Sequence, residues 1–284
     1  PIPLMYLFED KNGKKQVVDG RQRISAILDF LEGKFKLNNL RILKQFNGCC
    51  FADLDLKQQG VIEDFQLLFY IIQPPTPERV KYDIFDRVNR GGTPLNKQEM
   101  RNALYRGRCT RMLDKLCCSP EFLIATGRSI NKERMKDQYV VLRAMAFLML
   151  HRGEFKDIPA LQYRGDIDDF LARFMVYVND NAPEKLIVDY ENLFIRCMQI
   201  SYDLLGENGF RFSGNGIRRP INMPLFEALS YLFSFVPEKI DYTWASRLIL
   251  DIESVKEEFD DSRYFSGNID STTSVSFRFD RMDK

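Results

Sequence analysis

The hydrophobic pattern of the chain changes near residue 105, and this change limits the folds that the sequence can adopt. Before that point, strand-like apolar runs are mixed with helical spacing, and after it the apolar residues recur at helical spacing. The sequence therefore predicts an α+β protein, with a compact α/β unit over residues 1–105 and a mainly helical region over residues 106–284. With 284 residues and 45% hydrophobic content, the chain can bury a large core, as one big domain or two packed ones.

The stretch from Val17 to Arg23 joins the end of an apolar strand to an acidic glycine turn and the start of a helix. The apolar run from Leu4 to Phe8, followed by a polar turn with Gly13, predicts a hairpin that leads into this stretch. Beyond it, Gly33 is a natural helix stop after four apolar residues at helical spacing: Ile24, Ile27, Leu28 and Leu31.

A helix that begins at this turn would present a site for an anion. The unpaired backbone N–H groups near Gly20 to Gln22 and the positive end of the helix dipole would converge with the guanidinium of Arg23, and Gly20 would let the anion approach the backbone. The alternative is that Asp19 caps the helix and that the arginines are solvated surface charges. These residues by themselves favour neither interpretation.

The motif at this turn also resembles a known family. Gly20-Arg21-Gln22-Arg23 is similar to the Gly-x-x-Arg phosphate motif of the ParB/sulfiredoxin superfamily. With Asp19 included, it resembles the Asp-Gly-Gln-Gln-Arg signature of a domain-of-unknown-function family, found at the N-terminus of the restriction enzyme GmrSD and the defence protein SspE. Arg21 stands where that family usually has glutamine. Two later segments extend the resemblance: Phe85 to Asn96 with Glu99, and Arg134 to Asp137 with Leu142 and Arg143.

The resemblance implies a ParB/sulfiredoxin-like domain that binds a nucleoside triphosphate and Mg²⁺. It implies catalytic roles for Asp19 and Arg23, with Asp19 also available to Mg²⁺, and a set of nucleotide-binding residues: Gly20, Arg21, Gln22, Arg23, Arg87 and Asn89. We expect Arg87 or Asn89 to face the same pocket as Arg23, although on local grounds Asn89 could be a left-handed helix cap. Family members carry a segment upstream of such an Ile-Pro strand, so we expect the first part of the domain to be cut off or disordered.

The residue inventory excludes several mechanisms. His151 is the single histidine, and ββα-metal (HNH) nucleases, zincins and Ser-His-Asp hydrolases all need histidines that the chain lacks. His151 itself follows a buried helix, where a role at the helix C-terminus is expected. Sulfiredoxin chemistry is excluded because Arg21 and Gln22 replace the cysteine and histidine of its motif. Of the activities considered for the motif at residues 20–23, phosphate binding remains.

The function that follows from the resemblance is a nucleoside-triphosphate-binding and hydrolysing module of a bacterial anti-phage or restriction-type system. Its nucleotide state would control DNA engagement or a separate nuclease or effector subunit. Two alternatives stay open: a non-enzymatic DNA-binding or assembly protein with the same fold, and a ParB-like nuclease that does not use histidine.

Net charge and composition narrow the choice of partners. The net charge is +1, so the whole molecule does not attract nucleic acid or membranes, and a DNA contact needs a local patch. The loop over residues 206–220 supplies Arg211, Arg218 and Arg219 for such a patch, although an ordinary solvated loop explains them equally well.

Without a signal peptide or a long apolar run, we expect a cytoplasmic protein with no membrane contact, and a homo-oligomer stays open. The six cysteines, which lack a Cys-x-x-Cys motif, are expected to be reduced and mostly buried.

Further local patterns predict individual elements. The run from Phe65 to Ile72 predicts a strand that is buried on both faces, and Thr76 is expected to begin a helix. Asn96 to Glu99 forms a capping box for the next helix. Tyr139 to Leu150 predicts a central buried helix, and further helices are expected at residues 222–236 and 242–259. The polar tail from Asp260 to Lys284 is expected to order only against a partner.

Overall fold

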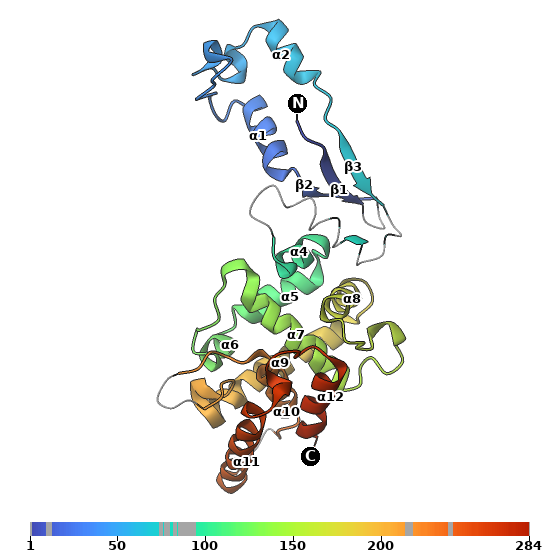
Figure 1. The fold of residues 1–284 in the computed structure, drawn as a ribbon, viewed down its shortest axis with the longest axis vertical. Coiled ribbons are helices and arrows are strands. Elements are labelled where there is room, and N and C mark those ends of the chain that lie inside the picture. Colours follow the sequence, from blue (N-terminus) through green and yellow to red (C-terminus); the bar gives the residue numbers. More distant parts are fainter. Residues whose placement is uncertain are drawn as a thin grey trace. The chain divides into compact units, whose positions relative to one another are not determined.

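The computed structural model describes residues 2–9, 13–73, 76, 80–81, 84, 95–213, 218–237 and 241–283 (Figure 1). The chain divides into two compact units, Pro1–Leu95 and Asn96–Lys284. The first unit contains a small three-stranded sheet, and the second is helical. This confirms the α+β class that the sequence predicts.

The sheet of the first unit is built on the predicted hairpin. Strand β1 (Met5–Glu9) pairs antiparallel with β2 (Lys15–Asp19) and parallel with β3 (Phe69–Ile72), so the strand order is β2-β1-β3. Because β1 is central, its Met5 side chain is inaccessible to solvent and that of Phe8 is 8% exposed. The sheet is therefore held mainly through β1.

Strand β3 differs from its prediction. It begins only at Phe69, and its first three residues are exposed, with Tyr70 at 57%. The prediction of a strand buried on both faces was wrong because β3 pairs on one side only, with β1, among the described residues. The apolar run over Phe65–Ile72 is the same for an edge strand and a central strand, so composition cannot distinguish them. The helix expected from Thr76 lies largely outside the described residues.

Helix α1 (Arg21–Leu31) follows β2 directly and stops as expected, with Gly33 in the left-handed region at φ 72°. Its one buried side chain is Phe30, which contacts the rings of Phe35 and Phe51 at centroid distances of 5.5 and 6.0 Å. Other helical segments that the structure describes in this unit are η1 (Lys44–Phe46), η2 (Phe51–Asp53) and α2 (Leu56–Glu63).

The second unit is an assembly of helices around α7 (Lys136–His151), which contains the predicted central helix (Figure 1). Apolar residues around nearly its whole circumference are buried, as the sequence predicts. The capping box at the start of α4 is also confirmed, since the Asn96 side chain accepts hydrogen bonds from the Gln98 and Glu99 N–H groups. The other elements are α4 (Lys97–Leu104), α5 (Arg108–Cys117), α6 (Pro120–Ala125), η4 (Glu133–Met135), η5 (Pro159–Leu161), α8 (Ile167–Asp180), α9 (Glu184–Leu205), η6 (Gly206–Asn208), α10 (Met223–Phe233), α11 (Tyr242–Asp260), η7 (Arg263–Phe265) and α12 (Thr272–Met282).

A buried ionic cluster joins α7, α10 and α12. Glu227 on α10 accepts hydrogen bonds from Arg143 on α7 and from Arg278 on α12, the latter at 3.1 Å, and all three side chains are inaccessible to solvent. Arg143 also pairs with Asp270 at 2.7 Å. One buried carboxylate therefore compensates two buried guanidinium groups, which makes its removal costly. Arg143 is also part of the family resemblance, and in the structure it is a member of this buried ionic cluster.

The polar tail was expected to order only against a partner, and this prediction was wrong. Residues 272–282 form α12, which packs on α10. Phe279 is inaccessible, and Val275 and Met282 are at most 9% exposed. These three residues have the spacing of one helix face, so the tail contains an amphipathic helix despite its serine and threonine content.

The single histidine does not act as a charged group at a helix end. His151 is the last residue of α7, and its ring stacks on Phe279 with a centroid distance of 3.6 Å. Burial lowers the pKa of His151 to about 4, with Arg278 acting in the same direction against Asp283. At neutral pH the ring is uncharged, so the expected interaction with the helix dipole does not form.

All six cysteines are free thiols, and three of them, Cys109, Cys117 and Cys197, are buried. Burial raises the pKa of Cys197 to about 12, so this thiol is unreactive at neutral pH. Within the described part of the chain, none of the helices combines the length and apolar character needed to cross a bilayer.

Candidate functional site at the start of helix α1

Gly20 forms the turn between β2 and α1, and two constraints require glycine there. Its φ of 98° lies in the left-handed region, which residues with a Cβ rarely adopt. A Cβ at this position would also lie 2.5 Å from Cγ and 2.6 Å from Sδ of the buried Met5. The glycine is therefore needed for packing against the central strand as well as for the turn.

The first turn of α1 leaves backbone donors available. The first helical hydrogen bond runs from the N–H of Ile24 to the carbonyl oxygen of Gly20, at 2.8 Å. No side chain caps the helix, and the N–H groups of Arg21, Gln22 and Arg23 have no hydrogen-bond partner among the described residues. The side chains of Arg21 and Gln22 are exposed. Such a helix start, with free donors and the positive end of the dipole, favours an anion.

Asp19 and Arg23 lie together beside this helix start. The guanidinium of Arg23 donates to the Asp19 carboxylate through one terminal nitrogen and to the Pro3 carbonyl oxygen through the other, the latter at 2.8 Å. The two side chains are 25% and 31% exposed. Asp19 pairs with Arg23 and does not cap the helix, so the local alternative of an acidic cap with solvated arginines was wrong for this pair. The catalytic and nucleotide-binding roles stay predictions.

The ion pair changes what each group can offer a ligand. One oxygen of Asp19 is committed to Arg23, and its Oδ1 has no partner among the described residues. A single carboxylate oxygen suits Mg²⁺, which proteins commonly hold through one or two carboxylates together with substrate phosphates. Among the described residues, no group of three or more His, Cys, Asp or Glu side chains could hold a metal ion.

The segment from Phe85 to Asn96, which extends the family resemblance, cannot be placed relative to the turn at Gly20. Arg87 and Asn89 lie outside the described residues. The expectation that one of them faces the same pocket as Arg23 therefore stays a prediction.

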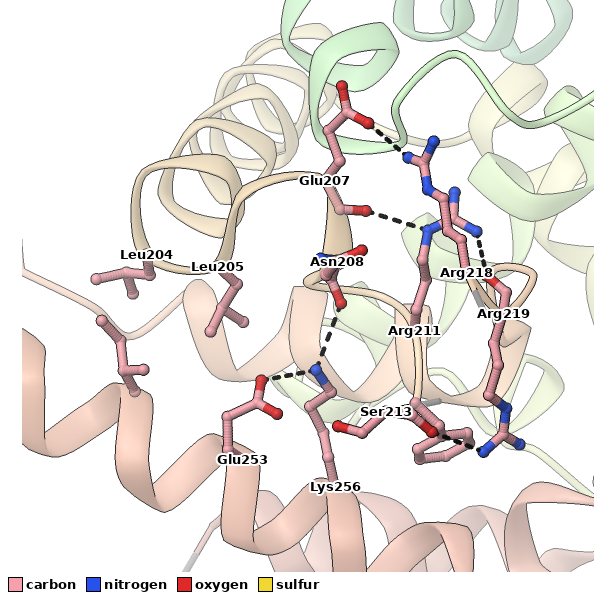
Figure 2. A pocket seen from close by; sticks show the side chains of 12 residues that line it. Leu204, Leu205, Glu207, Asn208, Arg211, Ser213, Arg218, Arg219, Glu253 and Lys256 are labelled. Carbon is pink, nitrogen blue, oxygen red and sulfur yellow. Dashed lines mark hydrogen bonds and ion pairs between the residues drawn. The ribbon is translucent and has the colours of Figure 1, made fainter. Parts of the chain in front are cut away.

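The three arginines expected to form a DNA-binding patch line a cavity of about 780 Å³ in the helical unit (Figure 2). Arg211 is only 4% exposed, and its guanidinium donates to the carbonyl oxygens of Glu207 and Thr126, both at 3.1 Å. The prediction that Arg211 lies in an exposed basic patch was therefore wrong. Arg211 joins its own loop to the backbone at the end of α6, which is a role in the fold.

The other basic groups of this cavity also have internal partners. Arg218 pairs with Glu207 at 2.6 Å, and Arg219 pairs with Asp260. Lys256, which is 3% exposed, pairs with Glu253 at 2.7 Å (Figure 2). Because Arg218, Arg219 and Lys256 each have an acidic partner, the cavity has less free positive charge than its sequence suggests. The DNA-binding role of Arg218 and Arg219 stays a prediction.

A family model for the N-terminal domain of the GmrSD restriction endonuclease matches residues 1–106. Residues 1–106 are thus similar to that domain, and we refer to them as the GmrSD-type domain. The GmrSD-type domain includes the Gly20 turn and the start of α1, so the candidate site lies inside the matched segment. The family indicates a protein of the restriction or defence type. No curated protein and no solved structure matches the chain.

Sequence reasoning missed a second polar cavity, which lies in the helical unit. It brings together Arg101 on α4, Lys136 on α7 and Asp168 on α8. Arg101 and Asp168 are 67 positions apart in the chain, and no local pattern connects them. Only an arginine at an otherwise helical core position marks the site in the sequence, and that signal is not specific.

Proposed function

We propose that the GmrSD-type domain binds a nucleoside triphosphate at the start of α1 and hydrolyses it with Mg²⁺. The protein would be the nucleotide-controlled module of a bacterial anti-phage or restriction-type system, and its nucleotide state would control DNA engagement or a nuclease or effector partner. The observation that carries the proposal is the uncapped start of α1, where three free N–H groups adjoin the Asp19–Arg23 pair.

Each residue of the turn has a distinct part in this proposal. The N–H groups of residues 21–23 bind phosphate oxygens, and the exposed Arg21 adds a full positive charge. Arg23 exchanges part of its hydrogen bonding from Asp19 to the phosphate. Asp19 would hold Mg²⁺ or orient the attacking water, and a bound ion would neutralise charge on the phosphates.

The Asp19–Arg23 pair also favours a second candidate, a module that binds nucleotide or DNA without turnover. A carboxylate that stays bound to an arginine has fewer free lone pairs for a metal ion or a water molecule than an unpaired one. Phosphate release from the four triphosphates, with Mg²⁺ and with or without DNA, distinguishes the two. Absence of magnesium-dependent hydrolysis in every condition, with nucleotide still bound, would establish the non-enzymatic candidate.

The binding part of the proposal is tested by Arg23→Ala and Arg21→Gln in calorimetry. Loss of a charge-assisted contact of roughly 1.5–3 kcal/mol should weaken nucleotide binding at least about tenfold for Arg23→Ala. Arg21→Gln, at an exposed position, should weaken binding less and preserve turnover. Arg41→Ala is the matched control, because Arg41 is exposed in the same unit and has no ion pair among the described residues. Unchanged affinity in both test variants, with the circular dichroism spectrum intact, would refute the site.

The catalytic part is tested by Asp19→Asn. This change frees Arg23 from its carboxylate partner, so the variant should bind nucleotide at least as tightly as the unaltered protein. It should slow hydrolysis at saturating nucleotide, because the group that orients Mg²⁺ or water is lost. An unchanged hydrolysis rate at saturation would remove Asp19 from the mechanism.

A further inference from the structure

The cavity missed by sequence reasoning has a volume of about 470 Å³ and lies between the starts of α4 and α7. Four basic and two acidic residues contribute to its lining: Lys97, Arg101, Arg134, Lys136, Glu133 and Asp168. Its volume falls in the range of small-ligand sites, and its surplus of basic residues favours an anion. All of these residues belong to the helical unit, whereas the turn at Gly20 belongs to the first unit.

Arg101, from α4, is the buried cation among the residues that line this cavity. Its side chain is inaccessible to solvent, with Nε donating to Gln98 at 3.0 Å and one terminal nitrogen donating to Asp168 at 2.8 Å. The other terminal nitrogen, Nη2, has no hydrogen-bond partner among the described residues, although the guanidinium lies 5.2 Å from the centroid of the Tyr139 ring. A buried guanidinium donor without a partner is costly in a folded protein, and a ligand that accepts its hydrogen bond removes this cost.

The start of α7 adds a second attraction for an anion. No side chain caps this 16-residue helix, and its preceding residues Arg134 and Met135 both adopt left-handed backbone conformations at φ 56° and 58°. This strained backbone is held in place from α4, because the Asn96 side chain donates to the Arg134 carbonyl oxygen at 2.7 Å. The positive end of the α7 dipole and Lys136 thus adjoin the cavity that contains Arg101.

The basic side chains around the cavity differ in whether they have an acidic partner. Asp168 accepts from both Lys97 and Arg101, and although burial alone would raise the pKa of Asp168, these two hydrogen bonds lower it. Asp168 therefore stays ionised and compensates only part of the positive charge. Lys136, which is exposed, has no ion pair among the described residues.

We propose that this cavity binds the phosphate group of a small ligand, which accepts hydrogen bonds from Arg101 Nη2 and Lys136 at the start of α7. Phosphate fits this donor set because it has several acceptor oxygens and about two negative charges at neutral pH. The phosphate could be the free ion or part of a nucleotide, and the experiment has an arm for each source.

The test is calorimetric titration of the full 284-residue chain at low ionic strength, with inorganic phosphate in one arm and AMP in the other. Lys136→Ala should weaken binding about fivefold, and Arg101→Lys, which keeps the charge but removes the free donor, about tenfold. Lys185→Ala should change nothing, because Lys185 is an exposed lysine in the first turn of α9 and does not line the cavity. Binding in only one arm would identify the source of the phosphate and would support the proposal.

Two results would overturn the proposal: no binding in either arm, or equal weakening by Lys136→Ala and Lys185→Ala, which would indicate general charge attraction. If Arg101→Lys fails to fold by circular dichroism, Lys136→Ala decides. Arg23→Ala in the N-terminal domain should leave this binding unchanged, so failure at one site is distinguishable from failure at the other.

Discussion

The two units of the molecule bury their apolar residues to very different extents. In the helical unit, the α7 residues Val141, Leu142 and Phe147 are inaccessible to solvent. In the first unit, Leu56 on α2 is 87% exposed and Tyr70 on β3 is 57% exposed. Since burial of apolar surface dominates folding energy, the helical unit contains most of the stabilising contacts among the described residues.

The difference in burial bears on where the candidate nucleotide site lies. The candidate nucleotide turn lies in the unit with the smaller core, and its Gly20 depends on one buried contact with Met5. Ligand-binding segments are generally drawn from the less stable parts of a fold. We therefore expect substitutions in the two units to differ in size and in which part of the protein they unfold.

The largest effect is expected for Glu227→Gln in the helical unit. This change leaves Arg278 buried without a carboxylate partner and leaves Arg143 with only the partly exposed Asp270, so it should lower the free energy of unfolding by about 3–5 kcal/mol. Urea unfolding followed by circular dichroism measures the loss. The control is Glu258→Gln, which removes a partly exposed pair with Arg281 and should cost less than about 1 kcal/mol. Equal losses would mean that burial does not distinguish these pairs.

The next effect concerns pH. The pKa of His151 falls from 6.5 in the unfolded chain to about 4 in the folded protein, so between these values the unfolded state binds the proton more readily. Stability should therefore decrease as the pH falls from 7 to 4, by up to about 3 kcal/mol. His151→Gln should remove this component, as urea unfolding at pH 7 and pH 4.5 will measure. The same pH dependence of stability in the unaltered protein and in His151→Gln would show that His151 is not its source.

In the GmrSD-type domain, Gly20→Ala should cost about 1–3 kcal/mol, because it forces a Cβ into the left-handed region and against Met5. Gly33→Ala provides a matched control: its φ is also positive, at 72°, but a Cβ there meets nothing within 4 Å. The difference between the two variants measures the contact with Met5 apart from the backbone strain. Hydrogen exchange should show the loss in residues 1–95 and leave α7 protected.

The smallest effect compares two helix caps. Asp55 accepts a hydrogen bond from the N–H of Gln58 at the start of α2, and Asn96 has the same role for α4. Replacing either with alanine removes a contact of about 1 kcal/mol. Because α4 contains buried residues and α2 has none, Asn96→Ala should lower global stability in urea unfolding, whereas Asp55→Ala should increase only local hydrogen exchange in α2. A global loss from Asp55→Ala would weaken the contrast between the units.

Much of the fold could be predicted because it depends on residues that are close in the chain. The hairpin into Gly20, the stop of α1 at Gly33, the Asn96 capping box and the burial of α7 all follow from local spacing and turn chemistry. The location of a GmrSD-type domain was equally readable, because its motif is a continuous segment.

Tertiary structure decided the features that join distant residues. The edge position of β3, the order of the polar tail and the burial of Arg211 depend on which elements pack together, and composition does not encode that choice. Asp19 and Arg23 are close in the chain, but the sequence could not decide whether Asp19 caps α1 or pairs with Arg23. Both arrangements satisfy the carboxylate locally, and the structure shows the pair. The sequence by itself thus determined the elements and the motif, whereas the tertiary structure alone brought Arg101, Lys136 and Asp168 to one cavity, because contacts between distant segments form only when their helices pack.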